Sequence, residues 1–373
     1  MTKQLVLIGG GHAHMVTLAN LHTFIEKGHG VTVIQPSEYH YYSGMGPGML
    51  GGTYHPDEIR FATRRLVEAK GGRFILGKAY RIDPHKQRIL LEETEEGTEK
   101  EIPYDVLSCN AGSFVPRTMV QGQSGNLFTA KPIENLLVAK ERIINLSATK
   151  KITIAIVGSG PSAIEIAGNI HQLCRKQGGE MPRIQLFGGK KFMSGRPARV
   201  SCLVRKILGE KGIEIIEAGH VREIDNNKFF LENGRSYSAD IIFLAVGVKP
   251  SQLFARSGLP IGPDGGLLVD GFLRSRRYNN IFGGGDCIYF EPEPLDKVGV
   301  YAVRQNSVLY RNLLACLAGK EPEKFSPGGK YLLIYNLGDE EGVLSKGFVT
   351  FSGKLAFRVK DYIDRRFIRS FQN

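Results

Sequence analysis

The chain of 373 residues has few cysteines, and their spacing excludes several classes of protein. Its five cysteines are Cys109, Cys174, Cys202, Cys287 and Cys316, and no two of them form a C-x-x-C pair. This scatter argues against a disulfide framework, a zinc site and a thioredoxin-like redox centre. We therefore expect reduced thiols, as in the cytoplasm, where disulfides rarely persist.

Long apolar runs and leader-like segments are absent as well. The longest fully apolar stretches, such as IIFLAV at 241–246, are far too short to span a bilayer. The first residues, MTKQLVLIGGG, lead directly into an expected strand, so we expect no signal peptide. These features predict a globular cytoplasmic protein.

The charge of the chain is biased towards basic residues. Lys and Arg number 49 against 37 Asp and Glu, which favours contact with polyanions. No basic face with interleaved aromatics and no known nucleic-acid module is present, so we expect no nucleic-acid partner. Nucleotide phosphates and an anionic membrane surface are better candidates, and solvated surface charge is the simplest alternative. The histidines match no known set of metal ligands, so we expect no metal site.

Two segments share a pattern of buried strand, glycine turn and amphipathic helix. They are KQLVLIGGGHAHMVTLANLHTF (3–24) and KITIAIVGSGPSAIEIAGNIHQL (151–173), and each precedes a further strand, GVTVIQ (30–35) and RIQLFG (183–188). One glycine turn is weak evidence, but two such units in one chain predict two dinucleotide-binding folds. The alternative, glycine needed only for helix–strand packing, would have to hold twice.

The glycines suit the pyrophosphate of a dinucleotide. Glycine lets the backbone approach the phosphates, and the N-terminus of the following helix offers free N–H groups and a positive dipole end. The residues are Gly9, Gly10 and Gly11, with His14 in place of a third glycine, and then Gly158 and Gly160, with Ala163 third.

Three later strands run into turns of small residues. They are YDVLSCNAGS (104–113), ADIIFLAVGVKP (239–250) and NNIFGGGDCIYF (279–290). The last one delivers Asp286 directly after three glycines. A carboxylate at this place suits a ribitol hydroxyl, and it is compatible with a helix N-cap.

In this order of motifs the chain resembles the pyridine nucleotide-disulfide oxidoreductase superfamily of flavoproteins with two dinucleotide-binding domains. Within it, the branch of type II NADH:quinone and sulfide:quinone oxidoreductases is similar, and the subgroup often fused to selenide, water dikinase is the most similar. The segments that carry the resemblance are GGGHAH (9–14), YYSGMGPGMLGGTY (41–54), RPARV (196–200), VYAVRQNSVLYRNLLACLAG (300–319) and KDYIDRRFIRSF (360–371).

The resemblance implies an α/β fold with two Rossmann-like, three-layer ββα/α domains, the second inserted in the first. It places an FAD-binding domain at 1–115 and 255–330, and an NAD(P)-binding-like domain at 125–250. Residues 331–373 would form a C-terminal extension.

The resemblance also implies which residues meet FAD. Gly9, Gly10, Gly11 and His12 should contact the pyrophosphate, and the backbone of Ala79 should meet the adenine. Asp286, after Gly285, should hold the ribityl chain, and a helix starting near Val300 should point its positive end at the flavin. The other expected contacts are Gln35, Pro36, Ser43, Pro47, Ala111 and Gly112.

Two positions lack the acid that relatives use to bind a ribose. Gln35 stands at the first, and its amide can still bond a hydroxyl. Gly188 stands at the second, where the carboxylate normally selects NAD. Gly158, Gly160, Gly188 and Gly247 should line this second site. Lys190 and Lys191 could favour a 2′-phosphate, or be solvated loop charges, or the domain could bind no nicotinamide at all.

Four side chains match positions near the flavin ring in relatives. Glu165 matches an acid beside nicotinamide and flavin, with an ordinary glutamate at the start of a helix as the alternative. Gln305 and Arg304 match positions where quinone enzymes carry glutamines, although the earlier glutamine of that pattern is Val300 here. Lys297 is a weaker candidate.

The C-terminal segment from Gly353 mixes aromatic and basic residues. As a helix it would place Val359, Tyr362, Ile363, Phe367 and Phe371 on one broad face, with Arg358, Arg365 and Arg369 away from it. Phe357 and Ile368 would fall outside this face. This fits a helix lying on anionic lipid, as quinone-reducing relatives use. A helix docked on the protein's own core or at a homodimer contact is the alternative.

We therefore expect an FAD-dependent NAD(P)H dehydrogenase that passes electrons to a quinone or similar small acceptor. It would be cytoplasmic, with the inner face of the cytoplasmic membrane as a further location. A flavoprotein that oxidises a sulfur or selenium compound, and a flavin-bound sensor or partner-binding protein, are the alternatives. The segment YYSGMGPGML (41–50) lies where disulfide reductases hold their cysteine pair, and it contains none. Electrons should therefore leave the flavin directly.

Overall fold

The computed structural model describes residues 2–92, 101–122 and 125–372, and it contains two parallel sheets of five strands each. The first sheet has the order β22-β9-β1-β2-β5. These strands are β1 (Gln4–Ile8), β2 (Gly30–Gln35), β5 (Arg73–Leu76), β9 (Val106–Cys109) and β22 (Ile281–Gly283). Strands β1, β2, β9 and β22 are largely apolar and buried, as expected for a parallel sheet covered on both faces.

Short helices and one long helix accompany the first sheet. They are η1 (His12–His14), α1 (Met15–Ala19), α2 (His22–Glu26), α4 (Thr63–Ala69) and α9 (Gly299–Leu317). The sequence predicts one helix after the first glycine turn, but the structure divides it into three pieces. The carbonyl of Val16 accepts both the backbone N–H and the side-chain amide of Asn20, the residue directly after α1.

The second sheet has the order β12-β19-β13-β14-β15. Its strands are β12 (Leu127–Thr129), β13 (Thr153–Val157), β14 (Arg183–Phe187), β15 (Glu214–Ile216) and β19 (Ile241–Leu244). Its helices are α5 (Asn135–Ser147), α6 (Pro161–Gln177) and α7 (Ala198–Glu210). All of these strands fall between β9 and β22 in sequence. The predicted α/β class with two parallel-sheet units, the second within the first, is confirmed; the exact domain limits stay a prediction.

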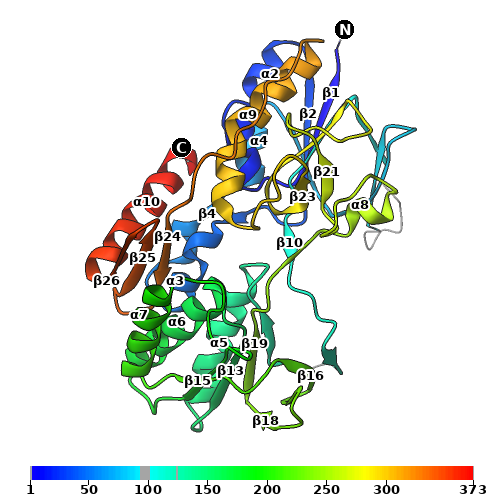
Figure 1. The fold of residues 1–373 in the computed structure, drawn as a ribbon. Helices are drawn as coiled ribbons and strands as arrows, with labels where there is room; N and C mark the ends of the chain where they lie inside the picture. The colour runs from blue at the N-terminus through cyan, green and yellow to red at the C-terminus, as the bar shows by residue number, and fades with distance from the viewer. Residues whose placement is uncertain (1, 93–100, 123–124, 373) are drawn as a thin grey trace.

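Smaller sheets and helices surround the two halves (Figure 1). Three small sheets have two strands each: β3 (His40–Tyr41) with β4 (Arg60–Phe61), β10 (Ser113–Phe114) with β20 (Lys249–Pro250), and β21 (Leu267–Val269) with β23 (Ile288–Phe290). A three-stranded sheet consists of β6 (Ala79–Asp83), β7 (Arg88–Leu91) and β8 (Glu101–Pro103). A four-stranded sheet consists of β11 (Val120–Gln121), β16 (Val221–Asp225), β17 (Lys228–Leu231) and β18 (Ser236–Ser238). The remaining helices before the C-terminal part are η2 (Ser43–Met45), α3 (Gly46–Leu50), η3 (Pro56–Ile59), α8 (Leu253–Arg256) and η4 (Gly285–Cys287).

The C-terminal part folds as a three-stranded antiparallel sheet and a helix, drawn in brown and red in Figure 1. These elements are β24 (Leu333–Asn336), β25 (Gly342–Lys346), β26 (Val349–Gly353) and α10 (Lys354–Gln372). They contact α6 and α7 of the second half, and α10 also contacts β4 of the first half. The extension therefore bridges the two halves along one side of the molecule.

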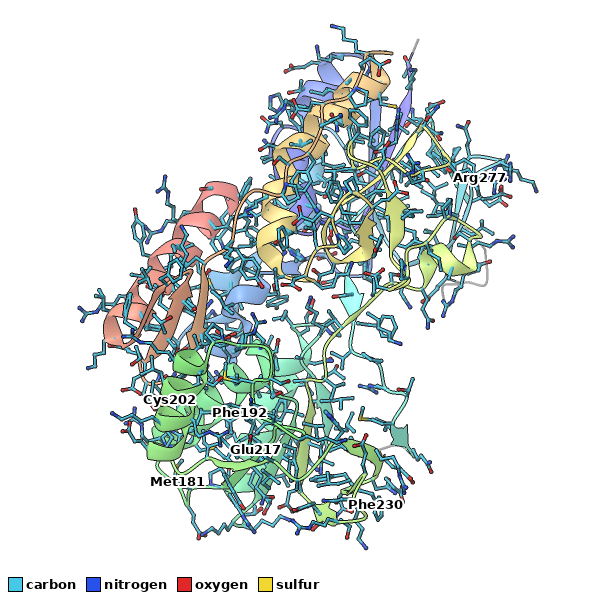
Figure 2. All side chains as sticks on the ribbon, in the orientation of Figure 1. Met181, Phe192, Cys202, Glu217, Phe230 and Arg277 are labelled. Atoms are coloured by element: carbon cyan, nitrogen blue, oxygen red, sulfur yellow. The ribbon has the colours of Figure 1, made fainter. Side chains whose placement is uncertain are left out.

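The five cysteines are all unpaired in the structure. Cys109, Cys174 and Cys287 are buried, whereas Cys202 on α7 is exposed (Figure 2). In the same half, the backbone N–H of Phe192 donates to the carboxylate of Glu217 at 2.7 Å, which fixes the loop after β14.

Candidate functional site: two glycine-lined pockets and a buried charged cluster

The first pocket lies at the carboxyl ends of β1, β2 and β9, and its volume is about 330 Å³. This edge of a parallel sheet is where α/β folds bind their ligands. The predicted residues that line it are Gly9, Gly10, Gly11, His12, Gln35, Pro36, Ser43, Ala79, Ala111, Gly112, Gly285 and Asp286. Gly299 and Ala302 at the start of α9 line it too, so this helix points its N-terminus at the pocket. Pro47 lies buried in α3 and is not among the lining residues.

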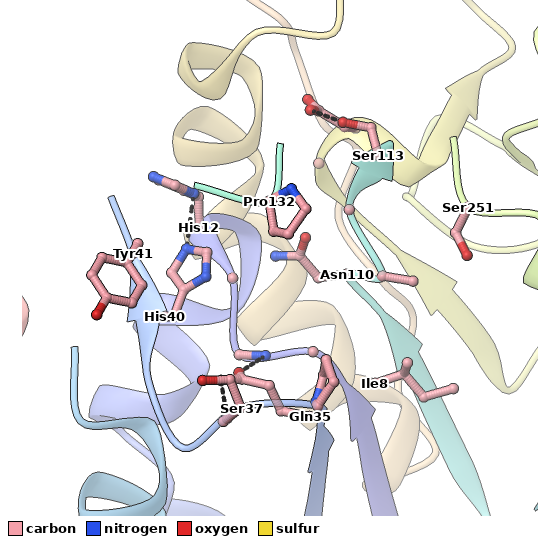
Figure 3. A pocket seen from close by; sticks show the side chains of 18 of the residues that line it. Ile8, His12, Gln35, Ser37, His40, Tyr41, Asn110, Ser113, Pro132 and Ser251 are labelled. Carbon is pink, nitrogen blue, oxygen red and sulfur yellow. Dashed lines mark hydrogen bonds between the residues drawn. The ribbon is translucent and has the colours of Figure 1, made fainter. Parts of the chain in front are cut away.

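The glycine turn of the first pocket depends on Gln35. Gly9 has φ +85°, and a Cβ atom there would lie 2.3 Å from the carbonyl oxygen of Asn110, so only glycine fits. The N–H of Gly10 donates to Oε1 of Gln35 at 2.8 Å. The amide of Gln35 donates in turn to the carbonyls of Ser37 and Tyr39 (Figure 3). Gln35 therefore fixes the turn at the position where relatives carry an acid.

His14 takes the place of the third glycine as a buried structural residue. Its Nδ1 lies 2.6 Å from the carbonyl oxygen of Gly9, and its Nε2 lies 2.8 Å from the hydroxyl of Ser108 on β9. Burial lowers the pKa of His14 to about 4, so the ring is neutral at pH 7. This imidazole ties the glycine turn to the neighbouring strand.

A second buried imidazole, His12, faces the pocket. Its Nδ1 lies 3.2 Å from Nε2 of His40 (Figure 3), and its ring stacks on Phe367 of α10. Burial, aided by the ammonium of Lys131, lowers the pKa of His12 to about 4, against the opposing charge of Asp286. The helix α10 therefore forms part of the wall behind the pocket.

Asp286 lies in an ion pair that the sequence did not predict. Its Oδ2 accepts hydrogen bonds from Nζ of Lys131 at 2.5 Å and from the hydroxyl of Ser113 at 2.7 Å. Burial would raise the pKa of Asp286, but the contacts with Lys131 and Ser113 lower it. Lys131 follows β12 in a segment without a motif, so no signal in the sequence pointed to it.

The residues of the first pocket fit a flavin dinucleotide. Among the described residues, Nε2 of His12 and Nδ2 of Asn110 are buried without a hydrogen-bond partner, although both residues line the pocket. Buried polar atoms normally have partners, so these two are available to a polar ligand. A Cβ at Gly11 would lie 3.1 Å from the side chain of Asn110, so this position leaves little room for a residue larger than glycine.

The second pocket lies at the carboxyl end of β13, and its volume is about 400 Å³. The predicted residues Gly158, Gly160, Gly188 and Gly247 all line it. A Cβ at Gly158 would lie 2.2 Å from the carbonyl oxygen of Ala245, so this turn also requires glycine. The helix α6 begins directly after Gly160, with proline at its first position.

No carboxylate and no ammonium is present among the described residues that line the second pocket. His220 is the titratable side chain there, and it lies close to Gly189. Lys190 is 76% exposed, with its Nζ 4.0 Å from Glu232. The described lining of this pocket thus offers no charged side chain of the Asp, Glu, Lys or Arg type to a ribose or its phosphate.

Glu165 belongs to a buried charged cluster under α10, outside the lining of both pockets. Its Oε1 accepts the N–H of Asn336 at 2.8 Å. Burial raises the pKa of Glu165 to about 7, and the ammonium of Lys360 opposes this rise. Lys360 donates to the carbonyl of Gly44 at 2.8 Å and to Asp364 at 2.9 Å.

This cluster adjoins the cysteine-free segment 41–50. Gly44 belongs to the cysteine-free segment 41–50, and the hydroxyl of Tyr42 in the same segment donates to Asp364 at 3.0 Å. The segment is thus joined to α10 by hydrogen bonds to charged side chains. A titratable carboxyl group, Glu165, lies in the same cluster.

The other predicted side chains have structural partners. Gln305 is buried, and its Oε1 accepts the N–H of Gly285 at 2.7 Å, next to Asp286. Arg304 points towards the carbonyls of Pro327 and Gly329. Lys297 pairs with Asp264 at 2.7 Å. Only Gln305 of these three supports the turn that carries Asp286, and the roles of all three stay predictions.

The outer face of the C-terminal part is apolar and basic. Phe348 at the tip of the β25–β26 hairpin is fully exposed, and Leu355 and Tyr362 on α10 are largely exposed.

Across residues 2–92, 101–122 and 125–372, no helix combines the length and apolar character needed to cross a membrane. In the same residues, no group of three or more His, Cys, Asp and Glu side chains is placed to hold a metal ion.

Comparison with protein families gives one match over most of the chain. The model of the family described as pyridine nucleotide-disulphide oxidoreductase matches residues 3–306. A protein named type II NADH:quinone oxidoreductase, from Staphylococcus epidermidis, is 26% identical over 98% of this chain and 95% of its own length.

Solved structures show the same fold. The sulfide:quinone oxidoreductase of Aquifex aeolicus matches with a TM-score of 0.80 and 20% identity, over 100% of this chain and 92% of its own. The NDH2 of Plasmodium falciparum, solved with NADH, also has a TM-score of 0.80, at 14% identity over 99% of both chains. The similarity to the subgroup fused to selenide, water dikinase stays a prediction.

Proposed function

The chain belongs to the pyridine nucleotide-disulphide oxidoreductase family, and from this we propose that it is an FAD-dependent NAD(P)H dehydrogenase without a redox-active disulfide. Its electron acceptor is a quinone or a similar small molecule. One observation carries the proposal: the chain has two glycine-turn pockets, and no cysteine is among the described residues that line either. The relative from Staphylococcus epidermidis, whose name states NADH and quinone, supports it.

The first pocket is the proposed FAD site. Gly9, Gly11 and His12 would lie against the pyrophosphate, Asp286 would accept a ribityl hydroxyl, and the N-terminus of α9 would favour negative charge. Bound FAD supplies hydride acceptance and two-electron transfer, and the protein supplies placement and electrostatics. The orphaned atoms of His12 and Asn110 support this assignment.

The second pocket is the proposed nicotinamide dinucleotide site. Gly158 and Gly160 would let the backbone approach the pyrophosphate at the start of α6. Because the lining described lacks a carboxylate, we propose that the pocket accepts NADPH as well as NADH.

Glu165 is the proposed proton-holding group. A pKa near 7 lets a carboxyl group both take up and release a proton at neutral pH. Lys360 and Asp364 connect the cluster of Glu165 to the backbone of Gly44 in the cysteine-free segment. The predicted domain limits of 1–115 with 255–330, 125–250 and 331–373 are part of the same proposal.

We further propose that the protein binds the inner face of the cytoplasmic membrane through its C-terminal part. Phe348, Leu355 and Tyr362 are exposed apolar or aromatic side chains, and Arg358, Arg366 and Arg369 are exposed on the same helix. This combination fits an anionic lipid surface that contains a quinone. A homodimer contact through the same face is the alternative.

Anaerobic mixing tests the proposed reaction. The FAD-loaded protein is mixed with NADH and, in parallel, with NADPH, and the flavin absorbance is followed. We expect the absorbance to bleach with at least one nucleotide and to return when a soluble quinone is added. Bleaching with neither nucleotide would contradict the proposal and would favour a non-nicotinamide donor or a sensor.

A further inference from the structure

The first pocket contains a partly buried ion pair that joins the two halves of the molecule. Lys131 comes from the segment after β12 in the second sheet, and Asp286 follows β22 of the first sheet. Their side chains are only 28% and 12% exposed, and the distance from Nζ to Oδ2 is 2.5 Å. The residues that follow Lys131, from Pro132 to Glu134, line the same pocket.

The ammonium of Lys131 acts on several groups around the pocket. It lies 3.0 Å from the hydroxyl of Ser113, which also bonds Asp286. Its charge contributes to the lowered pKa values of His12 and His40, for both of which burial is the main cause. Among the described residues that line the pocket there is one further ammonium, on Lys78, which is 61% exposed and paired with Glu92. Of the two lysines among the described residues that line the pocket, Lys131 is therefore the less exposed.

The charges of the ligand make this cation important. The proposed cofactor carries two phosphate charges, and the carboxylate of Asp286 faces the same pocket. Without Lys131 the pocket would place a buried, unpaired carboxylate near these phosphates, and buried charges are costly unless they are paired. When the bound cofactor takes up two electrons and one proton, it gains one further negative charge.

We propose that Lys131 is a positioning residue supplied by the second half to the flavin pocket, where it orients Asp286 and stabilises the negative charge of the reduced cofactor. This inference rests on the proposed use of FAD. It predicts that the charge of Lys131, and not merely its packing, sets how easily the bound cofactor is reduced.

The test measures the two-electron midpoint potential of bound FAD by dye equilibration, which requires neither NAD(P)H nor quinone. In Lys131→Met the affinity of the protein for reduced FAD, relative to oxidised FAD, should fall at least tenfold. The midpoint potential of the bound cofactor should therefore fall by at least about 30 mV. Its dissociation constant for FAD should rise. Lys131→Arg, which keeps the charge, should restore the wild-type potential.

Lys211→Met is the matched control, because Lys211 also forms a poorly exposed ion pair, with Asp339 at 2.5 Å, but lies outside the lining of both pockets. Its potential should equal that of the wild type. If Lys131→Met does not retain FAD, the measurement is made on Lys131→Gln, which removes the charge but can still donate a hydrogen bond to Asp286.

The outcomes separate this inference from the proposed function. Wild-type protein that does not bind FAD would overturn the proposed function and, with it, the role of Lys131. If the wild type binds FAD but the neutral variants at position 131 have the same midpoint potential as the wild type, the inference alone is overturned. A lowered potential that Lys131→Arg also shows would overturn the role of charge.

Discussion

At the scale of single residues, two side chains that depart from the expected motif, Gln35 and His14, have clear structural roles. Gln35 holds the glycine turn through Gly10, and His14 joins the same turn to Ser108. The glycines and Asp286 could be predicted from the sequence because each belongs to a motif next to a strand. Lys131 could not be predicted, because it is a single lysine in no motif, and only the fold brings it to Asp286.

The first residue-scale prediction concerns Gly9. Gly9→Ala places a methyl group 2.3 Å from the carbonyl of Asn110 at φ +85°. We expect loss of FAD binding and a fall in the free energy of unfolding of roughly 1–3 kcal/mol. The control is Gly28→Ala, which has φ +80° but no atom within 4 Å of the added Cβ. Thermal unfolding and FAD titration of both variants measure this, and equal effects would contradict the steric account.

The second prediction concerns the pH dependence of stability through Glu165. Its pKa is raised to about 7 in the folded protein, so the folded state binds more protons than the unfolded state between roughly pH 4.5 and 7. The free energy of unfolding that the protonated carboxyl group contributes is fully present below pH 4.5, and it is lost progressively as the pH rises towards and through 7. Glu165→Gln should therefore gain stability relative to wild type between pH 5 and pH 8 in urea titrations. A constant difference across that range would contradict the raised pKa.

The third prediction concerns nucleotide selection at Gly188. This residue stands where relatives carry the selecting acid, and a Cβ there would contact the ring of Phe192 at 3.2 Å. Gly188→Asp adds a carboxylate for the ribose hydroxyl and repels a 2′-phosphate. The ratio of kcat/KM for NADH over NADPH should rise by about tenfold, as expected for one charged hydrogen bond. An unchanged ratio would show that the ribose lies elsewhere.

At the scale of elements, the strands could be predicted better than the helices. GVTVIQ forms β2 over its full predicted length, and all of its residues after Gly30 are buried, as expected for a strand of a parallel sheet covered on both faces. The expected first helix is divided into η1, α1 and α2, with one break at Asn20 that the apolar periodicity does not indicate. The C-terminal helix α10 is docked through Ala356, Phe357 and Ile368, two of which lie outside the face predicted for lipid.

The docking of α10 predicts the effect of removing it. Truncation after Gly353 would expose Phe61 and the ring of His12, which Phe367 covers, and would leave Glu165 without Lys360. We expect the truncated protein to unfold at a clearly lower temperature.

By contrast, Phe348→Ser with Tyr362→Ser should keep the wild-type melting temperature but reduce co-sedimentation with anionic vesicles. Unchanged vesicle binding by the double variant would rule out this face as a lipid surface.

At the scale of the whole molecule, the C-terminal part brings charged side chains to the cysteine-free segment 41–50. Residues from three separate parts of the chain, Gly44, Glu165 and Lys360, meet in one buried cluster. The missing cysteines in 41–50 could be seen in the sequence. What contacts this segment could not, because it depends on a helix more than 300 residues away in sequence.

The central claim is that electrons pass from nicotinamide to FAD to acceptor without a thiol. A variant in which all five cysteines are replaced by alanine tests it most directly, in a double-mixing experiment that reduces the flavin with NAD(P)H and then adds quinone. The account predicts flavin reduction and reoxidation at rates close to those of the wild type. A folded, FAD-loaded variant whose reduced flavin no longer passes electrons to quinone would contradict it.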